Sequence, residues 1–196
     1  MSRRLQISLA AVAYIVIALA LQWKAGTAKA DFTLHPDESA HLVTGMMVRD
    51  YFAQHLGESP MVYAKAYYAT YPKIAIGHYP PMFYIVEGAW FLLWPPSALS
   101  ITVLTALLAA MVALLAFVWN PLRLNVILAW VAGALGLMLP LSINAMLPVM
   151  SDHLLTIFIL LACMAWQRYC EVETRRMAIL FGLAAGAAIL TKASGL

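Results

Sequence analysis

The sequence predicts an all-α protein built as a polytopic bundle of transmembrane helices. Apolar residues make up 64% of its 196 residues and charged residues only 11%, whereas an ordinary soluble domain is about 45–50% apolar. The mean hydropathy is +0.83. The 12 Lys and Arg and 9 Asp and Glu residues are too few to form the charged surface of a soluble domain of this length. A net charge of +3 gives no indication of nucleic-acid binding.

The first membrane span is predicted at 5–22, where an almost continuous apolar run follows Arg3 and Arg4 and ends before Trp23. Basic residues before a first span favour a cytoplasmic N-terminus, and tryptophan is typical of the membrane interface. A cleavable signal peptide is the alternative, because 28–30 has the small-x-small form of a cleavage site. That site lies well beyond the apolar run, which favours a retained span.

Residues 23–97 are predicted to form a large external loop, since the chain turns polar and aromatic as far as Tyr79. Within it, Pro36 suits the first turn of a helix at about 37–56. A second helix at 80–94 is apolar but too short to cross a membrane. We therefore expect the second helix to lie in the membrane interface.

Four further spans are predicted from apolar runs separated by polar turns. The positive-inside rule places Arg123 and the cluster at 168–176 in the cytoplasm with the N-terminus, provided that 80–94 does not cross. The chain stops directly after the last apolar run, and we expect it to be truncated at its C-terminus. The further spans are predicted at about 98–118, 126–146, 150–168 and 177–192.

Two adjacent carboxylates, Asp37 and Glu38, follow the first span. Ionisable groups close to hydrocarbon are costly and mark candidate functional sites. At a helix N-terminus the unpaired backbone N–H groups favour negative charge. Asp37 and His41 are four residues apart and so share one helix face. The alternative interpretation is an acid that only caps the helix.

The histidines and acids of the sequence leave open whether the protein binds a divalent metal. His41, His78 and His153 could bind one together with Asp37 and Asp152, although these residues form no compact ligand motif. No cofactor is otherwise indicated.

Lys73 and Lys192 are candidate partners for a phosphate. Each lysine could instead be a membrane-surface anchor, and for Lys73 we favour the anchor. His78 is interpreted as a phosphate or acceptor contact, with a plain interfacial histidine as the alternative.

Four short motifs follow one another along the chain: PDESAH at 36–41, GHYPPMFY at 77–84, SDH at 151–153 and LTKASG at 190–195. In this order they resemble the N-terminal part of glycosyltransferase family 39, GT-C membrane enzymes related to protein O-mannosyltransferases and the aminoarabinose transferase of lipid A. The resemblance covers nearly the whole chain, but only about the first third to half of a family member. It implies one GT-C-type transmembrane domain over 1–196.

The resemblance implies an inner-membrane enzyme of the cell envelope. Such enzymes transfer a sugar from a polyprenyl-phosphate donor to a lipid, glycan or protein acceptor on the outer side of the membrane. In that comparison Asp37 corresponds to the acid that activates the acceptor, and Glu38 to its neighbour. His78 stands near the donor phosphate, and Asp152 matches a second acid. Relatives often carry an arginine shortly before that second acid, and 144–150 contains none.

Sugar transfer from a phosphate leaving group needs a general base and nearby positive charge, and Asp37 is the predicted base. The alternative class is a non-catalytic polytopic protein, either a transporter half or a scaffold in an envelope-polysaccharide system. A transporter should carry charged or helix-breaking residues at mid-span. No charge lies in 98–118 or 126–139, and the acids gather at one end of the spans, which favours chemistry at the membrane surface.

Overall fold

The computed structural model describes residues 1–29, 31–32, 35–75, 77–120 and 124–193. Within these ranges the chain is helical and contains no β-strand, so the predicted all-α class is confirmed. The helices are α1 (Arg3–Ala25), the 3-10 turn η1 (Thr27–Lys29), α2 (Pro36–Gln54), α3 (Pro60–Thr70), α4 (Met82–Leu93), α5 (Ala98–Trp119), α6 (Val126–Met138), α7 (Pro140–Met146), α8 (Asp152–Val172) and α9 (Arg175–Ile189).

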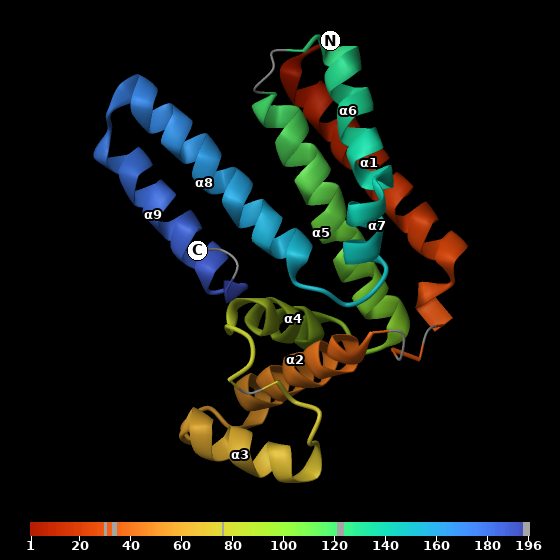
Figure 1. The fold of residues 1–196 in the computed structure, drawn as a ribbon, viewed down its shortest axis with the longest axis vertical. Helices are drawn as coiled ribbons and strands as arrows, with labels where there is room; N and C mark the ends of the chain where they lie inside the picture. Colours follow the sequence, from red (N-terminus) through yellow and green to blue (C-terminus); the bar gives the residue numbers. More distant parts are fainter. Residues whose placement is uncertain (30, 33–34, 76, 121–123, 194–196) are drawn as a thin grey trace.

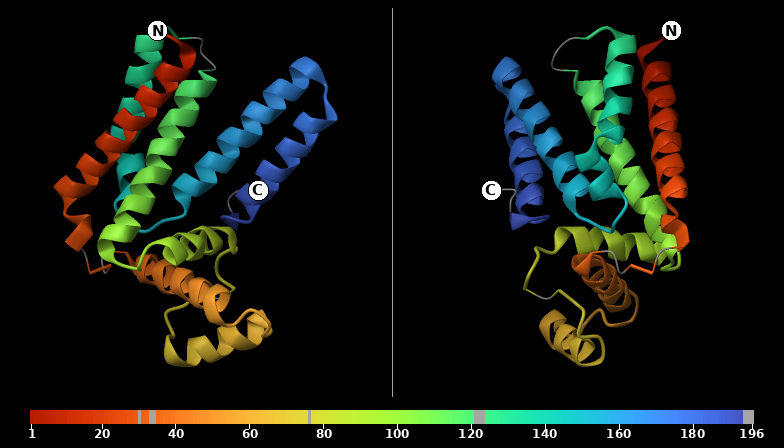
Figure 2. Two further views of the ribbon diagram at one scale, coloured as in Figure 1. Left: turned by 180° about the vertical axis from the view of Figure 1, so that it is seen from behind. Right: turned by 45° about the vertical axis from the view of Figure 1, so that its right-hand side comes forward.

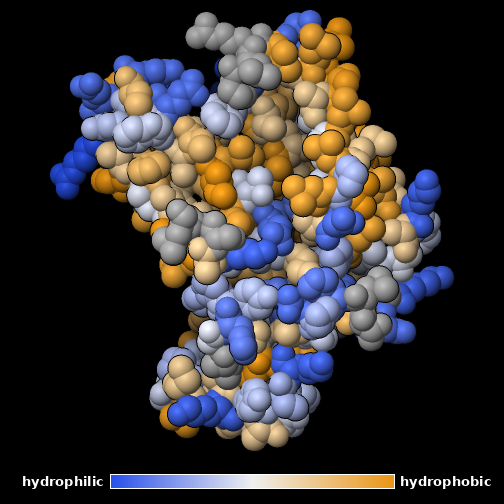
Figure 3. All heavy atoms as spheres, in the orientation of Figure 1, coloured by the Kyte–Doolittle hydropathy of each residue, from blue (hydrophilic) through white to orange (hydrophobic). Residues whose placement is uncertain are grey.

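The helices form three groups, two made of long helices and one made of shorter helices at one end of the molecule (Figure 1). Helix α5 packs against both α1 and α6, and α8 and α9 form an antiparallel hairpin that contacts α5 through α8. Helices α2, α3 and α4 lie beyond one end of the long helices, with α2 packed on α4. Figure 2 shows the same arrangement from two further sides. The hydrophobic surface in Figure 3 lies over α1 and α6, as expected for helices that face lipid.

Among the described residues, three helices are long and apolar enough to cross a membrane: α1, α5 and α8. A fourth crossing is obtained if α6 and α7 are taken together as one bent span. These helices support the prediction of a membrane protein.

Two of the predicted spans differ from the structure. The expected continuous span at 126–146 is broken at Pro140, where α6 and α7 meet at 60°. Proline lacks the N–H that a continuing helix needs, and its ring clashes with the preceding turn. The expected span at 177–192 is the 15-residue helix α9. At 1.5 Å per residue α9 is about 22 Å long, which is short of the roughly 30 Å hydrocarbon core.

The segment between the first two long helices contains both predicted helices. Helix α2 begins at Pro36, as the first-turn proline indicated, and α4 corresponds to the apolar run at 80–94. Helix α3 was not predicted, because its tyrosine-rich sequence has no clear apolar stripe; it also begins at a proline, Pro60. Some predicted features lie outside the described residues: the turn at Arg123, Ala30 of the cleavage-like site, and residues 194–195 of the last motif.

Small side chains and one buried amide hold α1 in the bundle. Ala10, Ala18 and Ala106 are fully buried and let α1 approach α5 closely. The buried amide of Gln22 donates hydrogen bonds of 2.7 Å to the Thr105 hydroxyl and of 2.7 Å to the Met146 carbonyl. Because an unpaired amide would be costly there, these bonds fix the end of α7 beside the end of α1, next to the candidate site.

Candidate functional site

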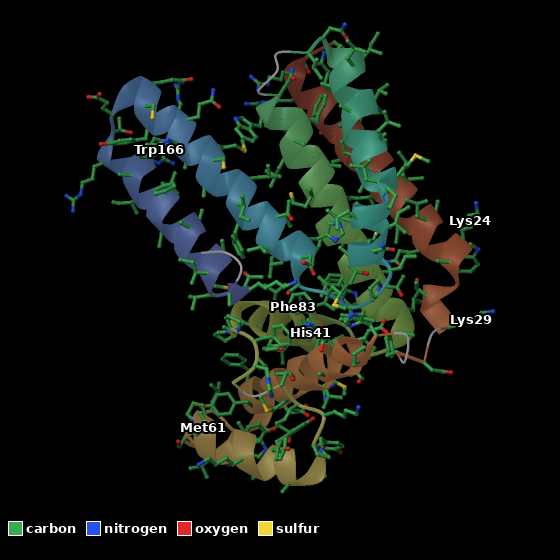
Figure 4. All side chains as sticks on the ribbon, in the orientation of Figure 1. Lys24, Lys29, His41, Met61, Phe83 and Trp166 are labelled. Carbon is green, nitrogen blue, oxygen red and sulfur yellow. The ribbon has the colours of Figure 1, made fainter. Side chains whose placement is uncertain are left out.

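The candidate site is a cavity of about 640 Å³ between the end of α1, the start of α2, the segment joining α7 to α8, and the residue Lys192 after α9. Figure 4 places His41 and Phe83 where α2 and α4 meet the ends of the long helices. Five of the eight candidate residues named from the sequence line this cavity. They are Asp37, Glu38, His41, Asp152 and Lys192.

Asp37 presents a partly exposed carboxylate to the cavity from the first turn of α2. The Tyr79 hydroxyl donates a 2.9 Å hydrogen bond to Oδ2 of Asp37. The His35 ring accepts a 3.3 Å hydrogen bond from the Asp37 backbone N–H, and its Nδ1 lies 3.7 Å from Oδ2. With 39% of its side chain exposed, Asp37 is held in place yet remains accessible to a ligand.

Glu38 is only 3% exposed, in contrast to its neighbour. Its Oε1 accepts a 3.4 Å hydrogen bond from the backbone N–H of Val149, and its Oε2 has no partner among the described residues. The contact connects α2 to the segment before α8. A carboxylate this buried suits a supporting role in the cavity wall better than the role of a general base.

His41 forms the buried wall of the cavity and is 2% exposed. Its Nδ1 lies 3.2 Å from the Tyr84 hydroxyl oxygen, and its ring packs against Tyr79 and Phe83 at centroid distances of 4.9 and 5.3 Å. Burial lowers the pKa of His41 to about 4, although the nearby carboxylate of Asp37 acts in the opposite direction. His41 is therefore neutral at physiological pH.

Lys192 brings a positive charge to the same cavity. Helix α9 returns antiparallel to α8, so Lys192 reaches the start of α8 and its Nζ lies 2.8 Å from Oδ1 of Asp152. The two side chains are 32% and 41% exposed. An ion pair this exposed contributes little to stability, which leaves the ammonium group available to an anionic ligand.

The other candidates lie elsewhere. His78 is exposed and is absent from the described residues that line the cavity, and Lys73 is also exposed. His153 is buried, with its Nε2 3.1 Å from the Ser142 hydroxyl, and lines a neighbouring apolar cavity. Over the described part of the chain, no three His, Cys, Asp or Glu side chains come together as a metal-binding group. We therefore assign no residues to a metal.

Two cavity residues were missed as site candidates in the sequence, Tyr79 and His35. Tyr79 was noticed only as one of a run of tyrosines, although it follows His78 directly in the second motif. Burial and the hydrogen bond to Asp37 raise the pKa of Tyr79. It is therefore a neutral donor to the carboxylate.

The cavity thus combines an accessible carboxylate, a neutral imidazole and an ammonium group. A carboxylate can accept a proton from a bound hydroxyl, and a lysine can bind a phosphate as a point charge. No family model matches this chain, and no curated protein or solved structure matches it significantly.

Proposed function

We propose that the protein is, or forms part of, a membrane glycosyltransferase of the GT-C type. It moves a sugar from a polyprenyl-phosphate donor to a lipid, glycan or protein acceptor. The observation that carries the proposal is that Asp37 and Lys192 line one cavity at the end of apolar helices, although they lie far apart in the sequence. This reaction needs a base and a cation at the same place.

In the proposed step, the Asp37 carboxylate takes the proton of the acceptor hydroxyl. The acceptor oxygen forms a bond to the anomeric carbon of the donor sugar, and the bond from that carbon to the phosphate oxygen breaks. The polyprenyl phosphate leaves with the bonding electrons, and Lys192 balances its negative charge. Tyr79 orients Asp37, and Glu38 supports the cavity wall through Val149. His78 stays a predicted contact outside this cavity.

The proposal includes an orientation in the inner membrane. The N-terminus and the α8–α9 turn are cytoplasmic, and α2, α3 and α4 lie outside, with α4 in the membrane interface. Cysteines introduced at Ser59 and Ser97 should then react with an impermeant external thiol reagent, and one at Asn120 should not. The native Cys163 and Cys170 are exposed and must first be replaced. Labelling at Asn120 with protection at Ser97 would overturn this orientation.

The catalytic assignment is tested by Asp37→Asn in the full-length protein. Asparagine has nearly the same volume and its amide oxygen can still accept the hydrogen bond from Tyr79, so the melting curve should stay nearly unchanged. Loss of a positioned general base lowers the rate about 10²–10⁴-fold. The measurement is turnover of a polyprenyl-phosphate sugar by purified protein.

Two matched variants accompany that measurement. Glu38→Gln should have a smaller effect on kcat than Asp37→Asn, and Asp152→Asn should act mainly on substrate binding through its contact with Lys192. Near-native turnover by Asp37→Asn would show that this acid only stabilises the first turn of α2, whose N-cap residue is His35. If the protein without substitutions does not turn over a polyprenyl-phosphate sugar, the alternative is favoured, a non-catalytic polytopic protein.

A further inference from the structure

A second large cavity lies at the opposite end of the bundle from the candidate site. Its volume is about 910 Å³, and it lies between α5 and the α8–α9 hairpin, close to the start of α1. Figure 2 shows the hairpin diverging from α1 and α5 toward this end. The volume falls within the range of about 300–1,000 Å³ that is usual for ligand-binding cavities.

The walls of this cavity are apolar, and its rim is basic. Phe158, Leu161, Leu180 and Leu183 form parts of the walls contributed by α8 and α9. At its rim lie Arg3 and Arg168 together with one acid, Glu171. Figure 3 shows hydrophilic residues gathered around the turn between α8 and α9, at the same end of the molecule.

The rim charges are available to a ligand. Arg3 makes no ion pair with any residue in the described ranges. Arg168 pairs with Glu171 at 2.6 Å, but both side chains are about half exposed, at 60% and 49%. Such a surface pair is weak, so an anion can compete with Glu171 for Arg168.

The residues of the rim lie at the ends of long helices. Arg3 begins α1, Trp119 ends α5, and Arg168 is in the last turns of α8. All three helices are candidate membrane spans. Tryptophan and arginine at span ends lie in the interface, with the apolar wall toward the hydrocarbon.

We propose that this cavity binds a membrane phospholipid with an anionic headgroup. The headgroup phosphate contacts Arg3 and Arg168, and an acyl chain lies along the leucines of α8 and α9. Basic pockets between transmembrane helices bind anionic lipid headgroups in this way. The apolar wall favours a lipid over a free phosphate, because an acyl chain packs against it and a free phosphate has no apolar group to place there.

The test is a lipid titration of the purified protein in neutral detergent, followed by native mass spectrometry. Phosphatidylglycerol should bind more tightly than phosphatidylcholine. Arg3→Gln and Arg168→Gln should each weaken phosphatidylglycerol binding about fivefold, the effect of one basic residue near a lipid surface. Glu171→Gln should strengthen binding, because it removes the competing partner of Arg168.

Arg4→Gln and Arg176→Gln are the matched controls, since both residues lie at the same end of the molecule but outside the cavity lining. Neither control should change the affinity. An equal loss of phosphatidylglycerol affinity in the controls would show that the effect comes from general surface charge, and would refute the site. Equal affinity for phosphatidylcholine, or binding of glycerol phosphate without acyl chains at similar strength, would also refute it.

Discussion

The buried neutral His41 predicts a measurable pH dependence of stability. In the unfolded chain its pKa has the ordinary value of 6.5, and in the folded protein burial lowers it to about 4. Between these pH values the unfolded state binds a proton that the folded state does not, so stability falls as the pH falls from 6.5 toward 4. At 1.36 kcal/mol for each pKa unit, the loss amounts to about 3 kcal/mol. Above pH 6.5 this contribution is fully present.

The assay compares the unchanged protein with His41→Asn in detergent from pH 7.5 to pH 4.5. Asparagine places an amide near the position of Nδ1 and can keep the contact with Tyr84, but it does not titrate. For a chain of this size, 3 kcal/mol corresponds to a difference of about 6–12 °C in Tm. The variant should lack that part of the acid-induced decrease. His78→Asn is the matched control for replacing a histidine, because His78 lies on the surface. Parallel profiles for His41→Asn and the unchanged protein would refute a buried neutral His41.

Two further changes probe the supports of the candidate site. In Gly45→Ala the new Cβ would lie 2.7 Å from the Glu87 Cβ, so we expect a loss of about 1–3 kcal/mol in unfolding free energy. The control Gly136→Ala meets no atom within 4 Å and should be neutral or stabilising; equal effects of the two changes would contradict close packing of α2 on α4. Tyr79→Phe removes the hydrogen bond to Asp37, which is worth about 1 kcal/mol, so kcat should fall roughly fivefold and Tm by no more than about 2–4 °C. An unchanged kcat would mean that Tyr79 does not orient the base.

The fold could be predicted where composition and local signals decide the structure. Continuous apolar runs predicted the long helices α1, α5 and α8, and the proline before two acids predicted the start of α2. Helix α3 was missed because its tyrosines give no one-sided apolar pattern. The break at Pro140 was missed because the apolar run continues through it, although proline at that position prevents an unbroken helix.

Individual residues of the candidate site could be predicted from the sequence, but the contacts between them could not. Charge was scarce enough that each acid near a span stood out, and Asp37, His41 and Lys192 do line one cavity. The hydrogen bond from Tyr79 to Asp37 joins residues 42 positions apart, and no local pattern encodes such a contact. The exposure of each acid could not be predicted either, because the sequence alone does not distinguish the partly exposed Asp37 from the buried Glu38.

Close packing between α2 and α4 sets the geometry of the candidate site. A Cβ at Gly45 would meet Glu87 at 2.7 Å, and one at Gly88 would meet Cγ1 of Val48 at 2.8 Å, so each helix presents a glycine to a side chain of the other. His41 lies one turn before Gly45, and its aromatic neighbours come from α4 and the segment before it. Any residue that separates the two helices should therefore change the cavity as well as the stability. We expect Gly45→Ala to lose activity even at temperatures where the folded protein is still fully populated.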